Sequence, residues 1–330
     1  MGFNDVIGNS GVKKVLQLAL QKNRIPNSLL FTGPKGVGKS SLAHVLARAV
    51  NCERETNDAC EKCPTCAAIA GRRLPDVWDI TPDGQMIKVE QMRFMRQAAY
   101  LRPMVAKKRV FIIDEAEKMN DEASNTVLKV LEEPPLFSLI ILVTSNSHLL
   151  LPTIKSRCQI LNFSPVAREE IKRVLVEKGY AEERARIISL VVRGNLEEAL
   201  ALEWDEVQSQ RQEAWSIFRS FSGKGESSAF LKTYAFARRD IVRKDFEKLL
   251  EFLASFCRDV ILIKESGDPS LLLNPDFSAE IESVKAKWTL EKAWDCLRRV
   301  EYAISGLSKN LNMSLLVGSF YSLIGEDIHV

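Results

Sequence analysis

The sequence lacks the features that would direct the chain to a membrane or out of the cell. No apolar run approaches the roughly 20 residues that a membrane-spanning helix needs. The opening stretch, MGFNDVIGNS, has neither the charged nor the apolar region of a signal peptide, and the residues after Gly2 do not fit the myristoylation pattern. We therefore expect a cytoplasmic protein without a membrane partner, in which disulfides are rare.

A strong charge of one sign and an internal repeat are also missing. The 46 lysines and arginines nearly balance the 43 aspartates and glutamates, which leaves a net charge of +3. This balance permits contact with nucleic acid but does not argue for it. No segment of the kind that builds solenoids or propellers recurs along the chain. A chain of 330 residues is long enough for two or three domains, each with its own core.

The first half of the chain alternates short apolar strands with helical patterns, which is typical of an α/β domain with a parallel sheet. The expected strands are 28–32, 77–80, 110–113 and 139–144, and the expected helices are 39–50, 88–100 and 121–133, the last with Asp121 as its N-cap. After Phe163 only helical patterns remain. The predicted domains are an α/β domain at 1–165, a small helical domain at 166–205 and an all-helical domain at 206–330.

The stretch GPKGVGKS at 33–40 fits the phosphate-binding pattern G-x-x-x-x-G-K-[ST] and lies between an expected strand and an expected helix. Gly33, Gly36 and Gly38 would let backbone N–H groups turn toward phosphate oxygens. Lys39 would reach the β- and γ-phosphates, and Ser40 would hold Mg²⁺. The alternative is a chance glycine-rich turn, and the flanking strand and helix argue against it.

A second strand supplies the acids that such a loop needs. In RVFIIDEAEKM an apolar strand ends at Asp114 and Glu115. Asp114 would bind Mg²⁺ through water, and Glu115 would orient and polarise an attacking water. The alternative is an ordinary solvated acidic strand end. Together with the loop, these acids predict a site for ATP and Mg²⁺.

Four of the seven cysteines are clustered in one insertion: Cys52, Cys60, Cys63 and Cys66. Thiols at this spacing can close on one tetrahedral ion, and a site of thiolates alone favours Zn²⁺. Because four protein ligands leave no open position, the predicted role of the zinc is structural. The alternative is four reduced thiols without metal. Cys158, Cys257 and Cys296 lie far apart in the sequence and are interpreted as ordinary core thiols.

These motifs, with DEAEKMNDEASNTVLKVLEEPP and the tripeptide SRC, resemble the clamp-loader subunits of bacterial DNA polymerase III, which are AAA+ proteins. The resemblance covers the whole chain, strongly over 1–165 and more weakly beyond. It implies a RecA-like domain, a helical lid and a helical collar that holds five subunits in a ring. The implied partners are the gamma/tau and delta subunits, primer-template DNA and, indirectly, the sliding clamp.

The resemblance also implies roles for single residues. Arg157 in SRC matches an arginine finger that reaches the ATP of the neighbouring subunit; the alternative is an ordinary surface ion pair. Motor subunits carry a G-x-x-R segment in the lid, and here GNLEEAL places Glu197 where that arginine is expected, unless the alignment is shifted by a turn. Arg193 has the wrong spacing to replace it. An acid at this position would oppose the use of ATP in the way of a motor.

We therefore expect a subunit of the delta-prime type, a stator that supplies Arg157 in trans for ATP-dependent clamp loading. Its own ATPase activity would be weak or absent, and the end of the chain soon after the collar favours the same interpretation. The first alternative is a gamma-type motor that hydrolyses ATP with Lys39, Asp114 and Glu115. A more remote alternative is another AAA+ ATPase such as a branch-migration motor, against which the cysteine insertion argues.

Two further patterns each allow a functional and a purely structural interpretation. A group of basic residues could follow a DNA backbone, but a solvated face is the favoured interpretation. The stretch SKNLNMSLLVGSFYSLI suits a collar helix and an ordinary core helix equally well. The basic residues are Arg93, Arg96, Arg102, Lys107, Lys108 and Arg109, and the apolar positions of the last stretch are Leu311, Leu315, Leu316 and Phe320.

Overall fold

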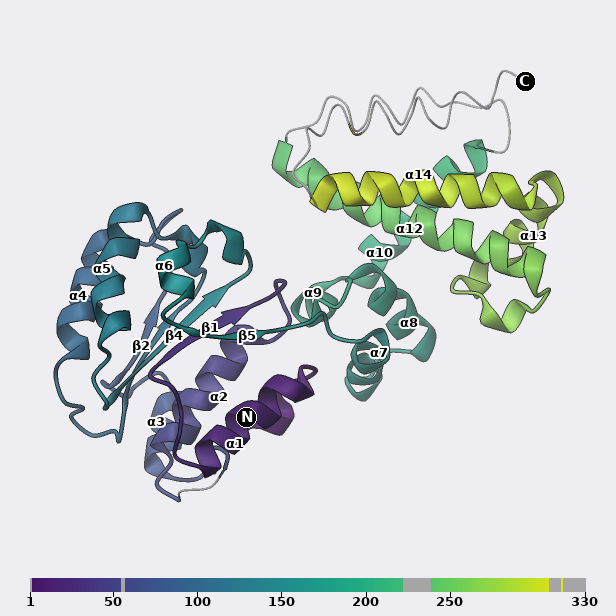
Figure 1. The fold of residues 1–330 in the computed structure, drawn as a ribbon. Helices are drawn as coiled ribbons and strands as arrows, with labels where there is room; N and C mark the ends of the chain where they lie inside the picture. The colour runs from purple at the N-terminus through teal and green to yellow at the C-terminus, as the bar shows by residue number, and fades with distance from the viewer. Residues whose placement is uncertain (1, 55–56, 222–238, 309–315, 317–330) are drawn as a thin grey trace. The chain divides into compact units, whose positions relative to one another are not determined.

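A computed structural model describes residues 2–54, 57–221, 239–308 and 316 (Figure 1). These residues form two compact units. The first comprises the chain up to Ile171 together with Arg193–Leu200, and the second comprises Lys172–Val192 together with the chain from Ala201 onward. The division into three domains expected from the sequence, with its two boundaries, stays a prediction.

A five-stranded parallel sheet organises the first unit. Its strand order is β2-β3-β4-β1-β5, and every neighbouring pair is parallel. This order places β1, which leads into the glycine-rich loop, between β4 and β5. The parallel sheet expected from the sequence is confirmed, with one strand more than predicted. The strands are β1 (Ser28–Thr32), β2 (Val77–Ile80), β3 (Arg109–Ile113), β4 (Ser138–Thr144) and β5 (Gln159–Asn162).

Helices cover both faces of this sheet, as Figure 1 shows. On one face α4 (Val89–Ala99) and α5 (Asp121–Glu132) pack over Phe111 and Ile140. On the other, α2 (Lys39–Asn51) contacts β3 and β4 and packs against α1. Because both faces are covered, every residue of β3 and β4 is buried, which explains their nearly continuous apolar sequence.

One helix boundary differs from the prediction. The N-cap of α5 is Asn120, not Asp121, since the Asn120 side chain accepts a hydrogen bond from the backbone N–H of Ala123 at 2.8 Å. Asp121 is the first residue of the helix, where its negative charge is still favourable beside the helix N-terminus. The remaining elements of the first unit are η1 (Phe3–Asp5), α1 (Ser10–Gln21), α3 (Pro64–Ala70), η2 (Ala116–Lys118), η3 (Ser147–Leu149), α6 (Pro152–Lys155) and α9 (Leu196–Ala201).

The described residues after β5 contain helices alone, as the sequence predicted. In the second unit α12 is central and contacts α8, α10, α13 and α14. Trp215, Phe218 and Phe256 form an aromatic core, with ring centroids 5.0 to 5.7 Å apart. The helix α7 (Arg168–Glu177) begins in the first unit and continues into the second. The other elements of the second unit are α8 (Glu182–Val191), α10 (Trp204–Ser220), α12 (Arg239–Glu265), η4 (Pro269–Leu271), η5 (Pro275–Phe277), α13 (Ser278–Lys287) and α14 (Leu290–Ser308).

Two features of the chain's last third complete the description. The predicted helical stretch at 308–324 lies outside the described residues, apart from Ser308 and the buried Leu316. Cys257 and Cys296, which are distant in sequence, lie in contact between α12 and α14, with 3.4 Å between their Sγ atoms. No helix within the described ranges is both long and apolar enough to cross a membrane.

Candidate functional site

The glycine-rich loop connects the end of β1 to the first residue of α2. At Gly33 the backbone φ is 148°, and the loop passes so close to Phe163 that a Cβ would lie 2.3 Å from the Phe163 carbonyl oxygen. No side chain fits there without moving the backbone, which explains the glycine at the start of the loop. The close approach fixes the loop against the residue that directly follows β5.

A cavity of about 680 Å³ lies beside this loop. It collects most of the residues that the sequence proposed for nucleotide binding, and Gly33 is the one that does not reach its wall. Several wall residues were not foreseen, above all the N-terminal segment 5–7 and Glu117. The full lining is Asp5, Val6, Ile7, Lys35, Gly36, Gly38, Lys39, Ser40, Ser41, Asp114, Glu115, Glu117, Val143, Ser145, Leu196, Glu197 and Leu200.

The Lys39 ammonium is the buried cation of the cavity. Its Nζ donates hydrogen bonds to the carbonyl oxygens of Gly33, at 2.7 Å, and of Pro34. Burial lowers the pKa of Lys39, and the carboxylates of Asp114 and Glu117 partly oppose that shift. Phosphate oxygens would offer this ammonium charged acceptors, which form stronger hydrogen bonds than the two neutral carbonyls.

Ser40 and Asp114 meet although they lie on different elements. The Ser40 hydroxyl donates to Asp114 Oδ2 at 2.5 Å, and Asp114 Oδ1 accepts the backbone N–H of Glu115 at 2.9 Å. A hydroxyl and a carboxylate are hard oxygen ligands of the kind that Mg²⁺ prefers, and Mg²⁺ usually retains several waters beside them. The structure therefore brings the two residues expected at the metal into direct contact, and their chemistry fits that ion.

Glu115 follows in an unusual backbone conformation. Its φ is 50°, in the left-handed region that residues with a side chain seldom adopt. Its carboxylate lies 2.7 Å from Lys118 Nζ and 3.6 Å from Lys35 Nζ. This turn directs Glu115 into the cavity wall beside Asp114, where it is held by two ammonium groups.

Glu117 is a third acid at this strand end that the sequence analysis did not single out. Its Oε1 accepts the backbone N–H of Ser145 at 3.1 Å and also the Ser145 hydroxyl. Burial would raise the pKa of Glu117, but hydrogen bonds, chiefly from Ser145 and Thr144, hold it below its usual value. Its signal in the sequence is the third acid of DEAEK, two residues beyond Glu115.

The start of α9 rests on the phosphate loop. The backbone N–H groups of Leu196 and Glu197 point to the Gly36 carbonyl oxygen, at 3.0 and 3.4 Å. Gly36 has a φ of 68°, and a Cβ there would lie 1.5 Å from Asn195 Oδ1, so only glycine fits beneath this turn. Glu197 thereby lines the cavity, whereas Arg193 is absent from the lining.

Arg157 lies elsewhere. Its Nε and Nη2 donate to Glu132 Oε1 at 3.0 and 2.6 Å, and its Nη1 donates to the Thr153 carbonyl at 3.1 Å. Its side chain is 33% exposed and does not line the cavity of its own chain. The surface ion pair considered for Arg157 is thus present, and it leaves part of the guanidinium open to solvent.

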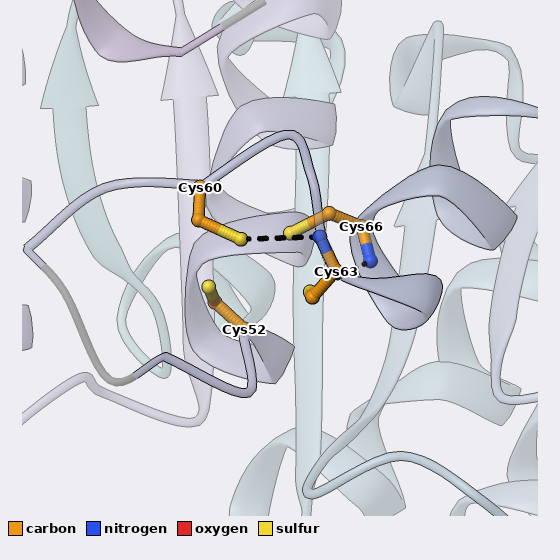
Figure 2. Close-up of side chains that lie close together, drawn as sticks. All are labelled: Cys52, Cys60, Cys63 and Cys66. Atoms are coloured by element: carbon orange, nitrogen blue, oxygen red, sulfur yellow. Dashed lines mark hydrogen bonds between the residues drawn. The ribbon is translucent and has the colours of Figure 1, made fainter.

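The four clustered cysteines form a second candidate site (Figure 2). Cys52 directly follows α2, and Cys63 is the N-cap of α3, so two helix ends bring the thiols together. All four Sγ atoms lie within 4.8 Å of one another. In a tetrahedral site with Zn–S distances of about 2.3 Å, neighbouring sulfurs are roughly 3.8 Å apart. The cluster therefore has the donors and the spacing to hold a metal ion.

Backbone groups around the cluster favour thiolates. The N–H groups of Cys63 and Cys66 point to the sulfurs of Cys60 and Cys63, both at 3.3 Å. Backbone hydrogen bonding, led by Lys62, lowers the pKa of Cys60 to about 6. Burial raises the pKa of the Cys66 thiol to about 12. A cation at the centre would let all four sulfurs ionise together.

The basic cluster is only partly an open surface. Arg109 is buried: its Nη2 donates to Asp76 Oδ1 at 2.9 Å and to the Arg102 carbonyl at 3.1 Å, and its Nη1 donates to the Ala98 carbonyl at 2.9 Å. The suggestion that Arg109 belongs to a nucleic-acid surface is therefore wrong, because the residue forms an internal ion pair. Its partner Asp76 is fully buried.

Two lysines of the same cluster are also engaged within the fold. Lys107 Nζ donates to the Cys52 carbonyl at 2.8 Å, and Lys108 Nζ donates to Asn27 Oδ1 at 3.1 Å. Burial lowers the pKa of Lys108. The residues of the predicted cluster with exposed or half-buried side chains away from these contacts are Arg93, Arg96 and Arg102.

Known proteins are similar in sequence to most of this chain. A family model described as DNA polymerase III, delta subunit, matches residues 8–167. The delta' subunit of Bacillus subtilis DNA polymerase III is 28% identical over 319 residues, which cover 96% of this chain and 95% of that subunit. The tau subunit of the same organism is 30% identical over 315 residues, or 88% of this chain. The chain is homologous to delta' and gamma/tau subunits of bacterial DNA polymerase III.

The homology differs in extent between the two relatives. This chain spans 54% of the length of tau, so much of tau has no counterpart in the residues compared. Among solved structures, a gamma subunit-related protein from Thermotoga maritima matches 95% of this chain at 19% identity and a TM-score of 0.43. The fold itself is a parallel five-stranded sheet in the first unit, with the glycine-rich loop after β1, and a helical second unit.

Proposed function

We propose that the chain is a clamp-loader subunit of the delta-prime type, which acts with other subunits in the ATP-dependent loading of a sliding clamp on primed DNA. In this role Arg157 serves as an arginine finger for the ATP of a neighbouring subunit. The homology to delta' and gamma/tau supports the assignment to this complex.

The observation that carries the delta-prime assignment is the placement of two charges. Arg157 does not line the cavity of its own chain and keeps a third of its side chain exposed. Glu197, by contrast, lines that cavity where a motor subunit is expected to have an arginine. A guanidinium at a γ-phosphate stabilises the transition state of phosphoryl transfer, whereas a carboxylate would oppose it. The chain thus lacks one cation at its own site and offers another outside it.

One observation favours the alternative of a gamma-type motor. Lys39, Ser40, Asp114 and Glu115 converge on one cavity, and these are the residue types that bind and hydrolyse ATP with Mg²⁺. We therefore include nucleotide binding at this cavity in the proposal and assign hydrolysis chiefly to the partner subunits.

The arginine finger is tested in a complex reconstituted with gamma/tau and delta subunits, a sliding clamp and primed DNA. Arg157→Ala should lower its ATPase rate by at least about tenfold, because arginine fingers contribute about 10³ to 10⁵ to the rate of phosphoryl transfer. Assembly, followed by gel filtration, should not change. An unchanged rate would exclude the trans role.

A matched control separates this role from a structural one. Glu132→Ala removes the partner of Arg157 but leaves the guanidinium in place. If Arg157 only supports its own fold through this pair, both variants should lower the rate equally. If it serves a neighbouring site, Glu132→Ala should leave the rate near that of the unmodified complex.

For the cysteine cluster we propose one structural Zn²⁺ held by Cys52, Cys60, Cys63 and Cys66. The purified chain should then contain about one zinc per chain by elemental analysis. Cys63→Ser should lose the metal and lower the thermal midpoint of the first unit, whereas Cys158→Ala, outside the cluster, should retain it. Metal-free protein with an unchanged thermal midpoint would refute this proposal.

A further inference from the structure

The charges around the nucleotide cavity are unequal. Its lining contains five carboxylates but only two ammonium groups, those of Lys35 and Lys39. Both lysines belong to the phosphate loop: Lys35 Nζ lies 3.6 Å from the Glu115 carboxylate, and Lys39 Nζ donates to the Gly33 carbonyl. The carboxylates belong to Asp5, Asp114, Glu115, Glu117 and Glu197.

Four of these acids are engaged. Asp5 accepts the N–H of Gly2 at 2.6 Å, and the hydrogen bonds of Asp114, Glu115 and Glu117 are those given above. Within the described residues, the Glu197 carboxylate accepts no hydrogen bond and forms no ion pair. Its carboxylate is therefore the one among the five in the lining whose charge no described hydrogen-bond donor or ion-pair partner offsets.

Glu197 is also held in place by its backbone. Its N–H and that of Leu196 point to the Gly36 carbonyl, and Asn195 caps the same turn by accepting the N–H of Glu198 at 3.0 Å. The side chain therefore emerges from a turn fixed on the phosphate loop itself. Burial lowers the pKa of Lys39, and Asp114, Glu117 and, least of the three, Glu197 oppose that shift.

We propose that Glu197 is a specificity-determining residue that makes this cavity favour a nucleoside diphosphate over a nucleoside triphosphate. This inference rests on the proposed function, because it requires that the cavity bind nucleotide. Lys39 reaches the β- and γ-phosphates in loops of this pattern, and Glu197 lines the same cavity, so a γ-phosphate adds negative charge beside this carboxylate. A diphosphate places less negative charge there.

Coulomb repulsion is large enough to produce a measurable preference. At a separation of about 8 Å and an effective dielectric of roughly 20 to 40, one additional charge changes a binding constant on the order of tenfold. Salt screens partly exposed charges over a Debye length of about 8 to 10 Å, and Glu197 is exposed. The preference should therefore weaken as ionic strength rises, which a purely steric preference would not do.

The test is competition of ADP and of ATP, each with Mg²⁺, against a fluorescent ADP analogue bound to the full chain. We expect the unmodified chain to bind ADP about tenfold more tightly than ATP at low salt. Glu197→Gln keeps the backbone contact to Gly36 and removes the charge, so it should bring the two dissociation constants to near equality. Glu90→Gln, the same change at an exposed position outside the cavity, should leave the ratio unaltered.

Each outcome bears on a different statement. If both nucleotides bind but Glu197→Gln leaves their ratio unchanged, or the ratio does not respond to salt, the role of Glu197 is overturned while the nucleotide site stands. If neither nucleotide binds to any variant, nucleotide binding itself is overturned, and this inference with it. The reconstituted ATPase assay of Arg157 is independent of both results.

Discussion

Two arginine–carboxylate pairs in the first unit have the same chemistry and opposite surroundings. Arg109 and Asp76 are buried, and the guanidinium also donates to two backbone carbonyls. The side chains of Arg157 and Glu132 are 33% and 49% exposed. The first pair is closed off from solvent, whereas the second stays partly exposed and within reach of another molecule.

The comparison separates charged residues that stabilise the fold from charged residues at the surface that contribute little to it. Besides Arg109, the Asp76 carboxylate accepts the backbone N–H groups of Met104, Val105 and Ala106, at 2.7 to 2.9 Å. This single buried acid thus organises the connection between α4 and β3. Arg157 also donates to three acceptors of its own chain, Glu132, the Thr153 carbonyl and Ser156 Oγ, but these contacts lie at the surface and leave its side chain 33% exposed.

The largest effect should come from breaking the buried pair. Arg109→Met leaves Asp76 buried without its cation, and such changes typically cost about 3–5 kcal/mol of stability. Urea unfolding at pH 7, followed by circular dichroism, measures the loss for the first unit. A loss below about 1 kcal/mol would mean that the buried pair matters no more than a surface pair.

The pH dependence sharpens this prediction. Burial alone would raise the pKa of Asp76, but hydrogen bonds from three backbone N–H groups and from Arg109 hold it below its usual value. A carboxyl whose pKa is lowered by folding stabilises the fold above its ordinary pKa of about 3.9 and loses that contribution as the pH falls through the folded value. The difference between the unmodified chain and Arg109→Met should therefore shrink below about pH 4.

The contrast between these pairs also shows what the sequence could predict. Four strands and the helices between them were predictable, because a parallel sheet covered on both faces produces apolar runs. The strand β5 was not, since three of its four residues are exposed and only Leu161 is buried. The cap of α5 was misplaced because Asn120 and Asp121 are both capable of capping, and only the backbone geometry decides between them.

For the site, a residue was predictable where it belongs to a known pattern, as Ser40 and Asp114 do although they lie 74 positions apart. The loop pattern identified Lys39 and Ser40, whose chemistry depends on neighbours in sequence. The contact of Glu117 with Ser145 joins residues 28 positions apart, and no local pattern indicates it. Arg109 was misread for the same reason, since the acid that neutralises it lies 33 positions earlier. Long-range pairs decide whether a charge is internal, and a single sequence does not display them.

The smallest stability effect should come from the exposed pair. Arg157→Ala removes an ion pair of a kind that typically contributes about 0–1 kcal/mol, so its urea midpoint should stay close to that of the unmodified chain. A double-mutant cycle with Glu132→Ala measures the coupling directly and should give less than about 1 kcal/mol. A coupling as large as that of a buried pair would make Arg157 a structural residue. A small coupling free energy together with a large loss of ATPase rate in the assembled complex would mean that Arg157 contributes little to the stability of its own chain. Its contribution would then be to catalysis at a neighbouring subunit.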